Sequence, residues 1–486
     1  MKLDVGGTKT DRVLAAAFGP DVYVIGGPVR DKLRELFHGV PFEPKDKDYV
    51  VVGATVKVVQ DRLGSFGRLD AVGASFGVLK LTVDDEPTVD VALPRRERST
   101  GWGHKNFEVD SGPHVTLEED QGRRDFLMNA VAVQLTTGTL IEHPGALDDI
   151  RARRITAING RQTFLDDPLR MLRAAQFAAR IGFDIEETTL SFMTASSALV
   201  QTVSPERIAE ELTKLLVKSE QPSRGIRILH QTGILQSVIP GVEQGAGVEQ
   251  NSFHRYDVLD HNLATLDRSR PDLVARWVAL LHDIGKPATQ SAEKGRYGYT
   301  FYSHDHVGAQ MTATILRDLR YTNDMIDRAV RLVENHMYLA DPTLSDATLK
   351  RFINRIGVDH LDDQFHLRFC DRLGSGVPSS STAKRNAEFE RRVRDILARK
   401  PPLSRKDLAV DGHDVLTAMA AALAMPVTKV AGPRVGKVLK ILVDRVIDDP
   451  DLNVRDRLHD EMLNVVDAVL NDEKSAARKA SGGGVR

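Results

Sequence analysis

The periodicity of apolar residues changes at about Phe164, and this change constrains the fold more than any other feature of the chain. Between residues 21 and 140, short runs rich in β-branched residues alternate with helical spacing. Beyond Phe164, apolar residues recur at helical spacing through most of the chain, with few β-rich runs. We therefore predict an α+β protein, in which a small mixed sheet is followed by a mainly α-helical remainder.

The individual elements and their breaks follow from the same patterns. Strands are expected at 21–27, 48–54, 78–83, 88–94 and 129–135, and the clearest helices at 29–37, 169–181, 206–218, 225–235 and 328–336. Glycine- and proline-containing breaks at 240–252, at 374–382 and around Pro401 mark expected subdomain edges. A chain of 486 residues is expected to form two to four domains or subdomains, because one hydrophobic core seldom organises so many residues.

Charge and composition limit the class of partner. The net charge is −2, so no global positive field attracts nucleic acid. Residues 151–180 nevertheless carry seven arginines against Asp166 and Asp167, which indicates an RNA-binding patch or, as the ordinary alternative, a solvated helix face. The single cysteine, Cys370, has no disulfide partner and is expected to be buried. No membrane-spanning stretch and no signal peptide are found, so we expect a cytoplasmic protein without a membrane partner.

Two glycines and three charged residues near the N-terminus form the first candidate site. Gly26 and Gly27 end a predicted strand where a helix begins, so that backbone N–H groups can approach a triphosphate, and Arg30 can pair with its oxygens. Asp46 and Asp48 are two residues apart, so on a strand their carboxylates point to one side and can share divalent ions. Two-metal phosphoryl transfer needs this arrangement, although paired acids near a turn are more often solvated or capping residues.

Together, GGPVRD at 26–31 and KDKDYVVVG at 45–53 resemble the head domain of the DNA polymerase β-like nucleotidyltransferases, in particular the bacterial CCA-adding enzymes and their poly(A) polymerase relatives. The resemblance implies that Asp46, Asp48 and Asp90 are catalytic and hold Mg²⁺. It continues in RRDF at 123–126, followed by Asn129-Ala130, which implies a nucleotide-binding role for Arg124 beside Gly26, Gly27 and Arg30. Leu127 departs from the family pattern, which has threonine there.

The segment DDPLRMLR at 166–173 is similar to the EDPLRxLR helix of the neck in this family. Asp167 and Arg170 are three residues apart and are expected on one helical face, where they can read the Watson–Crick edge of C or A. An ordinary salt bridge between the two is the alternative. The resemblance also implies that Arg173 contacts phosphate or sugar. Gln176 lies where a further arginine is usual, and its consequence is left open.

A second metal site is predicted farther along the chain. His261, the pair His282-Asp283 and Asp371 follow the order of the metal ligands in HD-family phosphohydrolases, and LHDIGK at 281–286 resembles their core signature. His304 and His336 match the two additional histidines of binuclear sites, with His306 as a competitor for His304. Imidazoles and carboxylates on neighbouring helices suit a divalent transition metal or Mg²⁺. The implied activity is hydrolysis of 2′,3′-cyclic phosphates or 2′-nucleotides.

The first residues of the chain carry a different signal. Asp4 to Thr10 looks like the phosphate loop of sugar kinases, but the elements that follow do not belong to a kinase, so a flexible N-terminal extension is expected. The resulting division is an extension at 1–20, a nucleotidyltransferase head at 21–150, a helical neck at 151–240, an HD domain at 241–375, a helical tRNA-binding region at 376–470 and a disordered tail at 471–486.

These features predict an enzyme that adds C and A residues to the 3′ end of tRNA from CTP and ATP, with an HD phosphohydrolase activity. Addition of CC or A alone and poly(A) synthesis are alternatives that the same head permits. A further alternative is an HD phosphohydrolase whose head serves only to bind RNA. The oligomeric state is not predicted.

Overall fold

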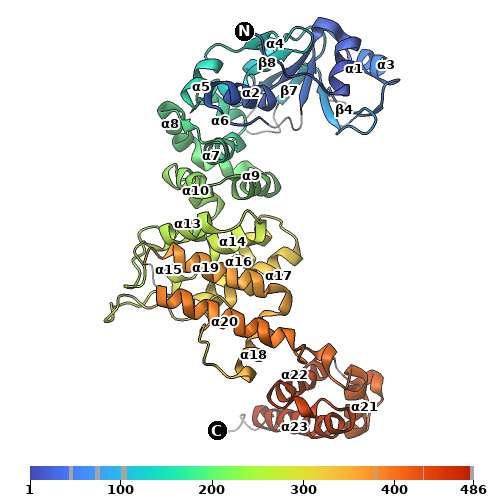
Figure 1. Cartoon of the computed structure of the whole chain (residues 1–486), viewed down its shortest axis with the longest axis vertical. Coiled ribbons are helices and arrows are strands. Elements are labelled where there is room, and N and C mark those ends of the chain that lie inside the picture. Colours follow the sequence, from blue (N-terminus) through green and yellow to red (C-terminus); the bar gives the residue numbers. More distant parts are fainter. Residues whose placement is uncertain (43–46, 72–76, 100–106, 378–379, 431, 482–486) are drawn as a thin grey trace. The chain divides into compact units, whose positions relative to one another are not determined.

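The computed structural model describes residues 1–42, 47–71, 77–99, 107–377, 380–430 and 432–481. The chain divides into two compact units, which can be followed by colour along the sequence in Figure 1. The first unit comprises Met1–Ala329 with Gly374–Gly376, and the second comprises Val330–Leu373 with Val377–Arg486. The boundary between Ala329 and Val330 lies inside the segment 241–375 that the sequence assigns to the HD domain.

A mixed sheet of seven strands organises the N-terminal part of the first unit. Its spatial order is β3-β4-β5-β2-β1-β8-β9. The strands are β1 Val22–Ile25, β2 Asp48–Val51, β3 Arg68–Ala71, β4 Val78–Thr82, β5 Val89–Ala92, β8 Val131–Gln134 and β9 Leu140–Glu142. β2 and β5 are parallel, and the other neighbouring pairs are antiparallel. A separate antiparallel ribbon joins β6 Arg95–Ser99 to β7 Phe107–Ser111.

The five predicted strands are confirmed as β1, β2, β4, β5 and β8. The central strands β1, β2 and β8 are rich in valine, whose branched side chains fill the core; Val22, Val51 and Val131 are fully buried. β3 and β9 were not expected. β3 has the sequence RLDA, which lacks β-branched residues, and β9 lies in a turn-rich segment, so neither has a strong strand pattern.

Five helices accompany the sheet in this part of the unit (Figure 1). They are α1 Lys9–Phe18, α2 Gly27–His38, α3 Val56–Leu63, α4 Leu117–Gly122 and α5 Ala146–Ala152. α2 confirms the helix expected at 29–37, and it ends at Gly39, whose left-handed backbone (φ 68°) suits glycine.

The expectation of a flexible N-terminal extension is wrong, because these residues contain a packed helix. Thr8 caps α1 and exchanges hydrogen bonds with Asp11, and Leu14 and Phe18 of this helix are buried. Asp11 accepts a hydrogen bond from Lys47 Nζ at 2.6 Å. The head therefore includes residues 1–20, because an amphipathic helix that buries apolar side chains gains more from packing than it loses in chain entropy.

The rest of the first unit is helical, as predicted. Its helices are α6 Gln162–Asp166, α7 Leu169–Ile181, α8 Glu187–Ser196, α9 Pro205–Lys218, α10 Pro222–Gln231, α11 Ile234–Val238, α12 Pro240–Glu243, α13 Val258–Arg268, α14 Leu273–Leu281, α15 Lys286–Thr289 and α16 His304–Asp318, with a two-stranded pair of β10 Arg154–Ile155 and β11 Asp184–Ile185. α7 packs against α9 and α10. Phe177 of α7 meets Phe126 edge-on, with ring centroids 6.1 Å apart, and this contact joins the neck to the head.

The second unit is also helical. The unit boundary falls within α17 Asn323–Glu334, and α18 Asp346–Ile356, α19 Leu361–Gly374, α20 Ser380–Ala398, α21 Gly412–Leu423, α22 Gly432–Asp448 and α23 Arg455–Ser481 follow. One core forms around Phe352 and Phe389, and another forms around Leu442 and Met462. Cys370 is fully buried, as expected.

The predicted disordered tail at 471–486 is corrected in part, because α23 continues to Ser481. Residues 474–480 have the sequence KSAARKA, in which alanine, lysine and arginine favour helix and so extend α23 beyond the last buried residue, Leu470. Residues 482–486 lie outside the described residues. None of the helices in the described ranges has the length and apolar character that spanning a membrane requires.

Candidate functional sites in the head, the neck and the HD segment

Two predicted catalytic carboxylates lie on neighbouring strands. β2 and β5 are parallel, and their register pairs Asp48 directly with Asp90. Side chains of paired residues project from the same face of a sheet, so both carboxylates belong to one face. Lys80 Nζ lies 3.4 Å from Asp90 Oδ1. Oxygen ligands from two adjacent carboxylates fit a magnesium ion. Asp46 lies outside the described residues, so its pairing with Asp48 stays a prediction.

A cleft of about 720 Å³ brings most of the predicted nucleotide-binding residues together. Six of the residues named from the sequence line it: Gly26, Gly27, Arg30, Asp48, Arg124 and Arg173. They come from the residue before α2, from α2 itself, from β2, from the segment after α4 and from α7. Asp90, Asp167 and Arg170 are not among its lining residues. The cleft therefore joins one face of the sheet to the neck helix.

Gly26 fits this wall of the cleft because of its backbone and its surroundings. Its φ is 71°, and a Cβ atom at this position would lie 2.9 Å from a guanidinium nitrogen of Arg124. Its amide donates to the Val131 carbonyl at 2.9 Å. α2 begins at the next residue, Gly27, which lines the cleft and whose amide belongs to the first turn, where helix amides have no intrahelical partner. Such a helix N-terminus is suited to bind phosphate.

Arg30 is buried on α2, with 3% of its surface exposed. Its guanidinium donates to both carboxylate oxygens of Asp31, at 3.0 and 2.9 Å, and to Asn129 Oδ1 at 2.7 Å. It also lies over the Phe177 ring, 5.1 Å from the centroid. These contacts hold the charge of Arg30 in a fixed place in the cleft wall.

Asp125 is a functional candidate that the sequence interpretation did not single out. Its carboxylate accepts hydrogen bonds from Arg173 Nε at 2.8 Å and from Asn129 Nδ2 at 2.9 Å. Burial alone would raise the pKa of this carboxyl, but the charge of Arg173 and the hydrogen bond from Asn129 lower it to about 2. The ionised Asp125 therefore fixes the guanidinium of Arg173 at the cleft. Its place in the RRDF motif was the available signal.

The expected geometry of Asp167 and Arg170 is corrected. Asp167 follows α6 with extended backbone (φ −138°), and α7 begins only at Leu169, so the two residues do not share a helix. Asp167 is held instead by Arg207 of α9, whose Nη2 lies 2.7 Å and Nη1 3.3 Å from its two carboxylate oxygens. Arg170 Nη2 donates to the carbonyl of Arg123 at 2.8 Å. Pro168 interrupts the helical pattern, because the residue before a proline is driven out of helical backbone.

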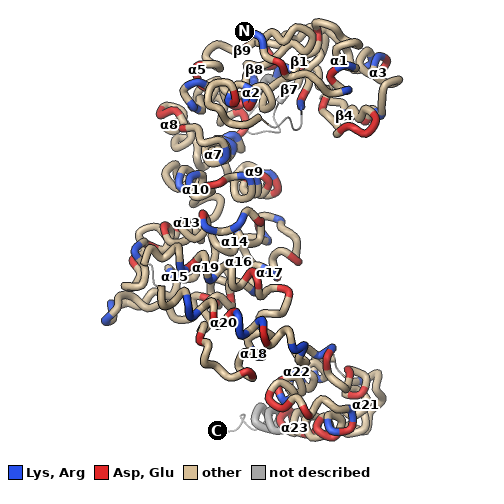
Figure 2. Tube along the Cα trace, in the orientation of Figure 1, with Lys and Arg blue, Asp and Glu red and all other residues tan. Residues whose placement is uncertain are grey.

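The arginine-rich segment is divided between two roles. Figure 2 shows Lys and Arg gathered along α7. Arg170 and Arg173 bind groups of the protein in the neck and head. Arg153, Arg154 and Arg161 are exposed, although Arg154 also pairs with Asp149 and Arg161 donates to the Ala195 carbonyl. Gln176, where the family usually has arginine, is buried with 2% of its surface exposed. This position therefore adds no charge to the surface of α7.

Four of the predicted HD ligands lie together in the first unit. His261 Nε2 is 3.1 Å from His282 Nε2, and Asp283 Oδ2 is 3.2 and 3.3 Å from these two nitrogens. His304 Nε2 approaches the other oxygen of Asp283 at 3.3 Å. All four side chains are buried. His306 is exposed, which favours His304 over its competitor.

Neighbouring groups orient these ligands. His282 Nδ1 lies 3.0 Å from the Ala279 carbonyl and His304 Nδ1 2.7 Å from the Phe301 carbonyl, so each Nε2 is the nitrogen available to a metal. Burial would raise the pKa of Asp283, but Lys286 and His282 hold it well below its usual range. A carboxylate and imidazole nitrogens that converge within hydrogen-bond distance fit a divalent transition metal.

The remaining predicted ligands belong to the second unit. His336 follows α17, and its Nδ1 lies 2.7 Å from the Val333 carbonyl, which leaves Nε2 as the candidate ligand atom. Asp371 lies on α19, 3.7 Å from Arg368. Their membership of the ligand set stays a prediction.

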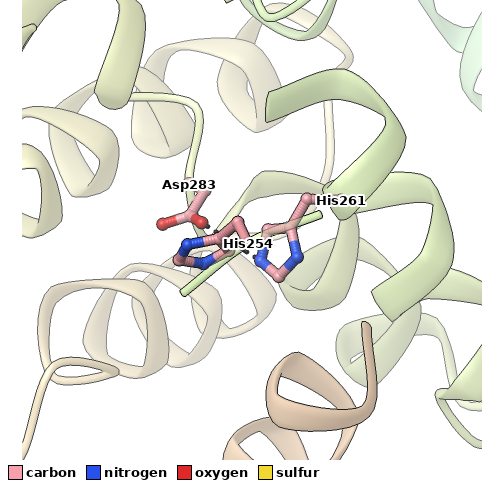
Figure 3. Close-up of side chains that lie close together, drawn as sticks. All are labelled: His254, His261 and Asp283. Atoms are coloured by element: carbon pink, nitrogen blue, oxygen red, sulfur yellow. Dashed lines mark ion pairs between the residues drawn. The ribbon is translucent and has the colours of Figure 1, made fainter. Parts of the chain in front are cut away.

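His254 was missed by the sequence interpretation. Figure 3 shows it beside His261 and Asp283, and the candidate ligand atoms of the three residues lie within 4.8 Å of one another. The rings of His254 and His261 meet edge-on, with centroids 4.8 Å apart. The only sequence signal was that His254 lies seven residues before the predicted ligand His261. This spacing is not typical of a metal-binding motif.

Comparison with solved structures defines the class of the fold. The Bacillus stearothermophilus CCA-adding enzyme, solved in complex with CTP, superposes with a TM-score of 0.65 and 21% identity, over 97% of this chain and 98% of that one. The Thermotoga maritima CCA-adding enzyme, solved with tRNA, has a TM-score of 0.53 and 19% identity, over 95% and 96% of the two chains. The fold is therefore that of the CCA-adding enzymes, with a mixed-sheet head and a long helical extension.

Family models and curated relatives agree with that class. The poly(A) polymerase head domain matches residues 22–156, a probable RNA- and SrmB-binding site of polymerase A matches 182–245, and the HD domain matches 260–364. A multifunctional CCA protein of Stenotrophomonas maltophilia is 35% identical over 347 residues, which are 69% of this chain and 80% of the relative. An A-adding tRNA nucleotidyltransferase of Deinococcus radiodurans is 32% identical over 437 residues, which are 88% and 92% of the two chains. The chain belongs to the family of tRNA nucleotidyltransferases that carry a poly(A) polymerase head and an HD domain.

Proposed function

We propose that this enzyme adds C and A residues to the 3′ end of tRNA, using CTP and ATP. The cleft is the observation that carries the proposal, since it joins the α2 N-terminus, Asp48 and the arginines Arg124 and Arg173 in one place. The resemblance to CCA-adding enzymes over most of the chain supports the choice of substrates.

The chain's own residues supply binding and orientation. The amides at Gly27 receive the triphosphate, and Arg124 and Arg173 contact its phosphates or sugar. Asp48 and Asp90, together with Asp46, would hold magnesium through their carboxylate oxygens. Magnesium, when bound, supplies activation of the 3′-hydroxyl and neutralisation of the leaving pyrophosphate. The hydroxyl oxygen bonds to the α-phosphorus of the nucleotide, and the bond to pyrophosphate breaks.

Base selection is assigned to Asp167 and Arg170. Their carboxylate and guanidinium offer an acceptor and donors that match the edge of C or A. Arg207 positions the Asp167 carboxylate through its two contacts, so selection depends on three residues rather than two. The exposed arginines of the neck, together with the helices at 376–470, would grip the acceptor stem by shape and phosphate contacts.

The number of nucleotides added is decided by a direct assay. The relatives include both a multifunctional CCA protein and an A-adding enzyme. Purified enzyme is incubated with tRNAs that end before CCA, after C and after CC, with CTP and ATP offered separately, and products are resolved to single nucleotides. We expect complete CCA; addition of A alone, of CC alone or of an open-ended tail would replace that assignment. Absence of any incorporation would remove the transferase function.

A second activity is supported by the buried cluster of His261, His282 and Asp283. We propose that it is a phosphohydrolase centre for 2′,3′-cyclic phosphates or 2′-nucleotides, with His304, His336 and Asp371 as further ligands. With a cyclic phosphate, water adds to phosphorus and one P–O ester bond breaks, which leaves a monoester and a free hydroxyl. With a 2′-nucleotide, the same step breaks the remaining ester bond and releases inorganic phosphate and a free hydroxyl. His282→Ala should end hydrolysis, reduce bound metal measured by elemental analysis and spare nucleotide incorporation. Unchanged metal content and unchanged hydrolysis would contradict the assignment.

A further inference from the structure

Two loops next to the HD cluster are joined into one surface. The loop between α15 and α16 is a short hairpin, in which Gln290 pairs with Phe301 and Gly295 pairs with Gly298. The Ser291 amide donates to the Thr300 carbonyl at 2.9 Å. The hairpin projects residues 294–298 at its tip.

The hairpin tip is bound to the loop that precedes α13. Asn251 pairs with Gly298, and the Ser252 amide donates to the Tyr297 carbonyl at 2.7 Å. Gly298 has φ 109°, and a Cβ atom there would lie 2.7 Å from Asn251 Cα. Glycine is therefore required for the close approach of the two loops. The contacts fix their side chains relative to each other.

Large aromatic side chains are exposed on this joined surface. Phe253 is 63% exposed and Tyr297 56% exposed, and their ring centroids lie 6.1 Å apart with planes inclined by 34°. Tyr302, at the base of the hairpin, is 82% exposed. Exposed aromatic groups from adjoining loops mark a binding surface more often than isolated apolar residues do. Their flat faces can receive nucleobases.

Positive charge accompanies the rings. The guanidinium of Arg296 lies 5.3 Å from the centroid of Tyr297, and Lys294 Nζ lies 5.3 Å from that of Tyr299. Lys294 also binds Glu249 at 2.7 Å, so part of its charge is neutralised, and Glu293 at the tip is exposed as well. Arg296 is exposed at the tip of the hairpin. Aromatic faces with an adjacent cation are the chemistry that binds single-stranded nucleic acid.

The surface lies next to the HD cluster along the chain. Phe253 is followed by His254, whose ring approaches His261 edge-on with centroids 4.8 Å apart. Tyr302 precedes, by two residues, His304, which is 3.3 Å from Asp283. Consecutive Cα atoms are about 3.8 Å apart, so the Cα atoms of Phe253 and Tyr302 lie within about 8 Å of those of His254 and His304. This distance is comparable to the length of one nucleotide. A base stacked on the rings thus leaves its phosphate near the cluster.

We propose that Phe253, Tyr297 and Tyr302, with Lys294 and Arg296, form a stacking platform that binds the last bases of a single-stranded RNA 3′ end and directs its terminal phosphate to the HD cluster. The choice of a terminal phosphate rests on the proposed phosphohydrolase function, whereas the binding of RNA by the platform does not.

Photo-crosslinking tests the binding step without requiring hydrolysis. The full-length enzyme is irradiated with an eight-nucleotide RNA that carries 4-thiouridine at its penultimate position and a 2′,3′-cyclic phosphate, and crosslinked peptides are mapped by mass spectrometry. We expect crosslinks in 250–256 or 290–303 that fall at least 10-fold in the double variant Phe253→Ala, Tyr297→Ala. Crosslinks only elsewhere, or equal crosslinking in the variant, overturn the proposal.

Hydrolysis kinetics provide the second readout. With the cyclic-phosphate RNA, the double variant should raise KM about 10-fold or more and leave kcat within about 2-fold, because each stacked base contributes on the order of 1–3 kcal/mol. The KM for a base-free ribose 2′,3′-cyclic phosphate should not change. Phe253→Tyr, Tyr297→Phe should restore the KM, and Phe66→Ala, at an exposed aromatic residue of the head, should leave it unaltered. If wild-type enzyme hydrolyses neither substrate, the phosphohydrolase assignment fails and the crosslinks still decide whether the platform exists.

Discussion

Arg173 of α7 contacts the carboxylate of Asp125 with an Nη2–Oδ2 distance of 2.7 Å, and this ion pair joins the neck helix to the RRDF segment of the head. Asp125 is nearly buried, with 8% of its side chain exposed. Asn129 and the Phe126 amide hydrogen-bond to the other oxygen of the same carboxylate. The position of Arg173 at the nucleotide cleft therefore depends on Asp125, which lines the cleft as well.

Replacement of Asp125 by alanine should weaken both folding and catalysis. The loss of one partner of a nearly buried ion pair costs about 3 kcal/mol, and Arg173 loses its orientation. We expect a lower urea midpoint and a KM for CTP raised by roughly 10-fold. Asp148→Ala, at an exposed carboxylate that pairs with Arg151 on the surface, is the control and should change neither value appreciably. A variant with wild-type KM would contradict the positioning role.

The same carboxylate predicts a pH dependence of stability. Its pKa is about 2 in the folded state against an ordinary value of 3.8. A lowered folded-state pKa contributes stability that is complete above pH 4 and is lost as pH falls from about 4 to 2, by roughly 2 kcal/mol. Urea unfolding between pH 5 and pH 2 should show a smaller decline for Asp125→Asn than for the wild type. Parallel pH profiles of the two proteins would show that this carboxyl is not the source.

Because Asp48 and Asp90 are paired on adjacent strands, substitution of either should reduce nucleotide incorporation to a similar extent. Asp48→Asn and Asp90→Asn each remove one charged ligand while keeping its shape, so incorporation should fall by at least about 100-fold. Far-UV circular dichroism should be unchanged, because both side chains are at least partly exposed. The HD phosphohydrolase activity of the same preparations should persist. Incorporation within 10-fold of the wild type in either variant would place the metal ligands elsewhere.

Gly26→Ala should impair the cleft more than a comparable glycine substitution. A methyl group at Gly26 meets the guanidinium of Arg124 at 2.9 Å in addition to the strain of φ 71°. Gly39→Ala, at the other end of α2, has φ 68° and no atom within 4 Å, so it carries backbone strain alone. We expect Gly39→Ala to lose about 1–2 kcal/mol of stability. Gly26→Ala should lose more, because its backbone (φ 71°, ψ −126°) lies outside the left-handed helical region. Only Gly26→Ala should raise the KM for CTP and ATP; equal KM values would show that Arg124 adjusts freely.

Arg207 should control the fidelity of nucleotide choice. Its two contacts, together with the Leu169 amide at 3.2 Å, hold the Asp167 carboxylate, and Arg207→Ala removes both charged contacts. We expect the preference for CTP and ATP over UTP and GTP to fall roughly 10-fold, with a smaller loss in Arg207→Lys, which keeps the charge but not the two-point contact. Thermal denaturation of both variants separates this effect from unfolding. Wild-type discrimination in Arg207→Ala would remove the residue from the selection of the base.

By itself, the sequence determined the division into a mixed sheet and a helical remainder, the five strands with strong β patterns and six of the residues that line the cleft. These follow from local spacing and from short motifs, which act within a few residues of the chain. The sequence also identified His261, His282, Asp283 and His304 as members of one set of candidate metal ligands, and the four residues lie close together in the structure. Weak strands such as β3 and the packed N-terminal helix were missed, because their stability comes from distant partners. The helical start of the tail was missed although its alanine, lysine and arginine residues favour helix locally.

Only the tertiary structure decided which charges meet. Arg207 is 40 residues from Asp167, and Arg173 is 48 residues from Asp125, so no spacing rule could pair them. The break at Pro168 removed Asp167 from the helix on which its motif suggested it would lie. His254 lies in a loop, and the path of that loop brings it close to His261 and Asp283. No periodic sequence pattern indicates this contact. Such contacts depend on the packing of whole elements, which sets distances that local sequence does not encode.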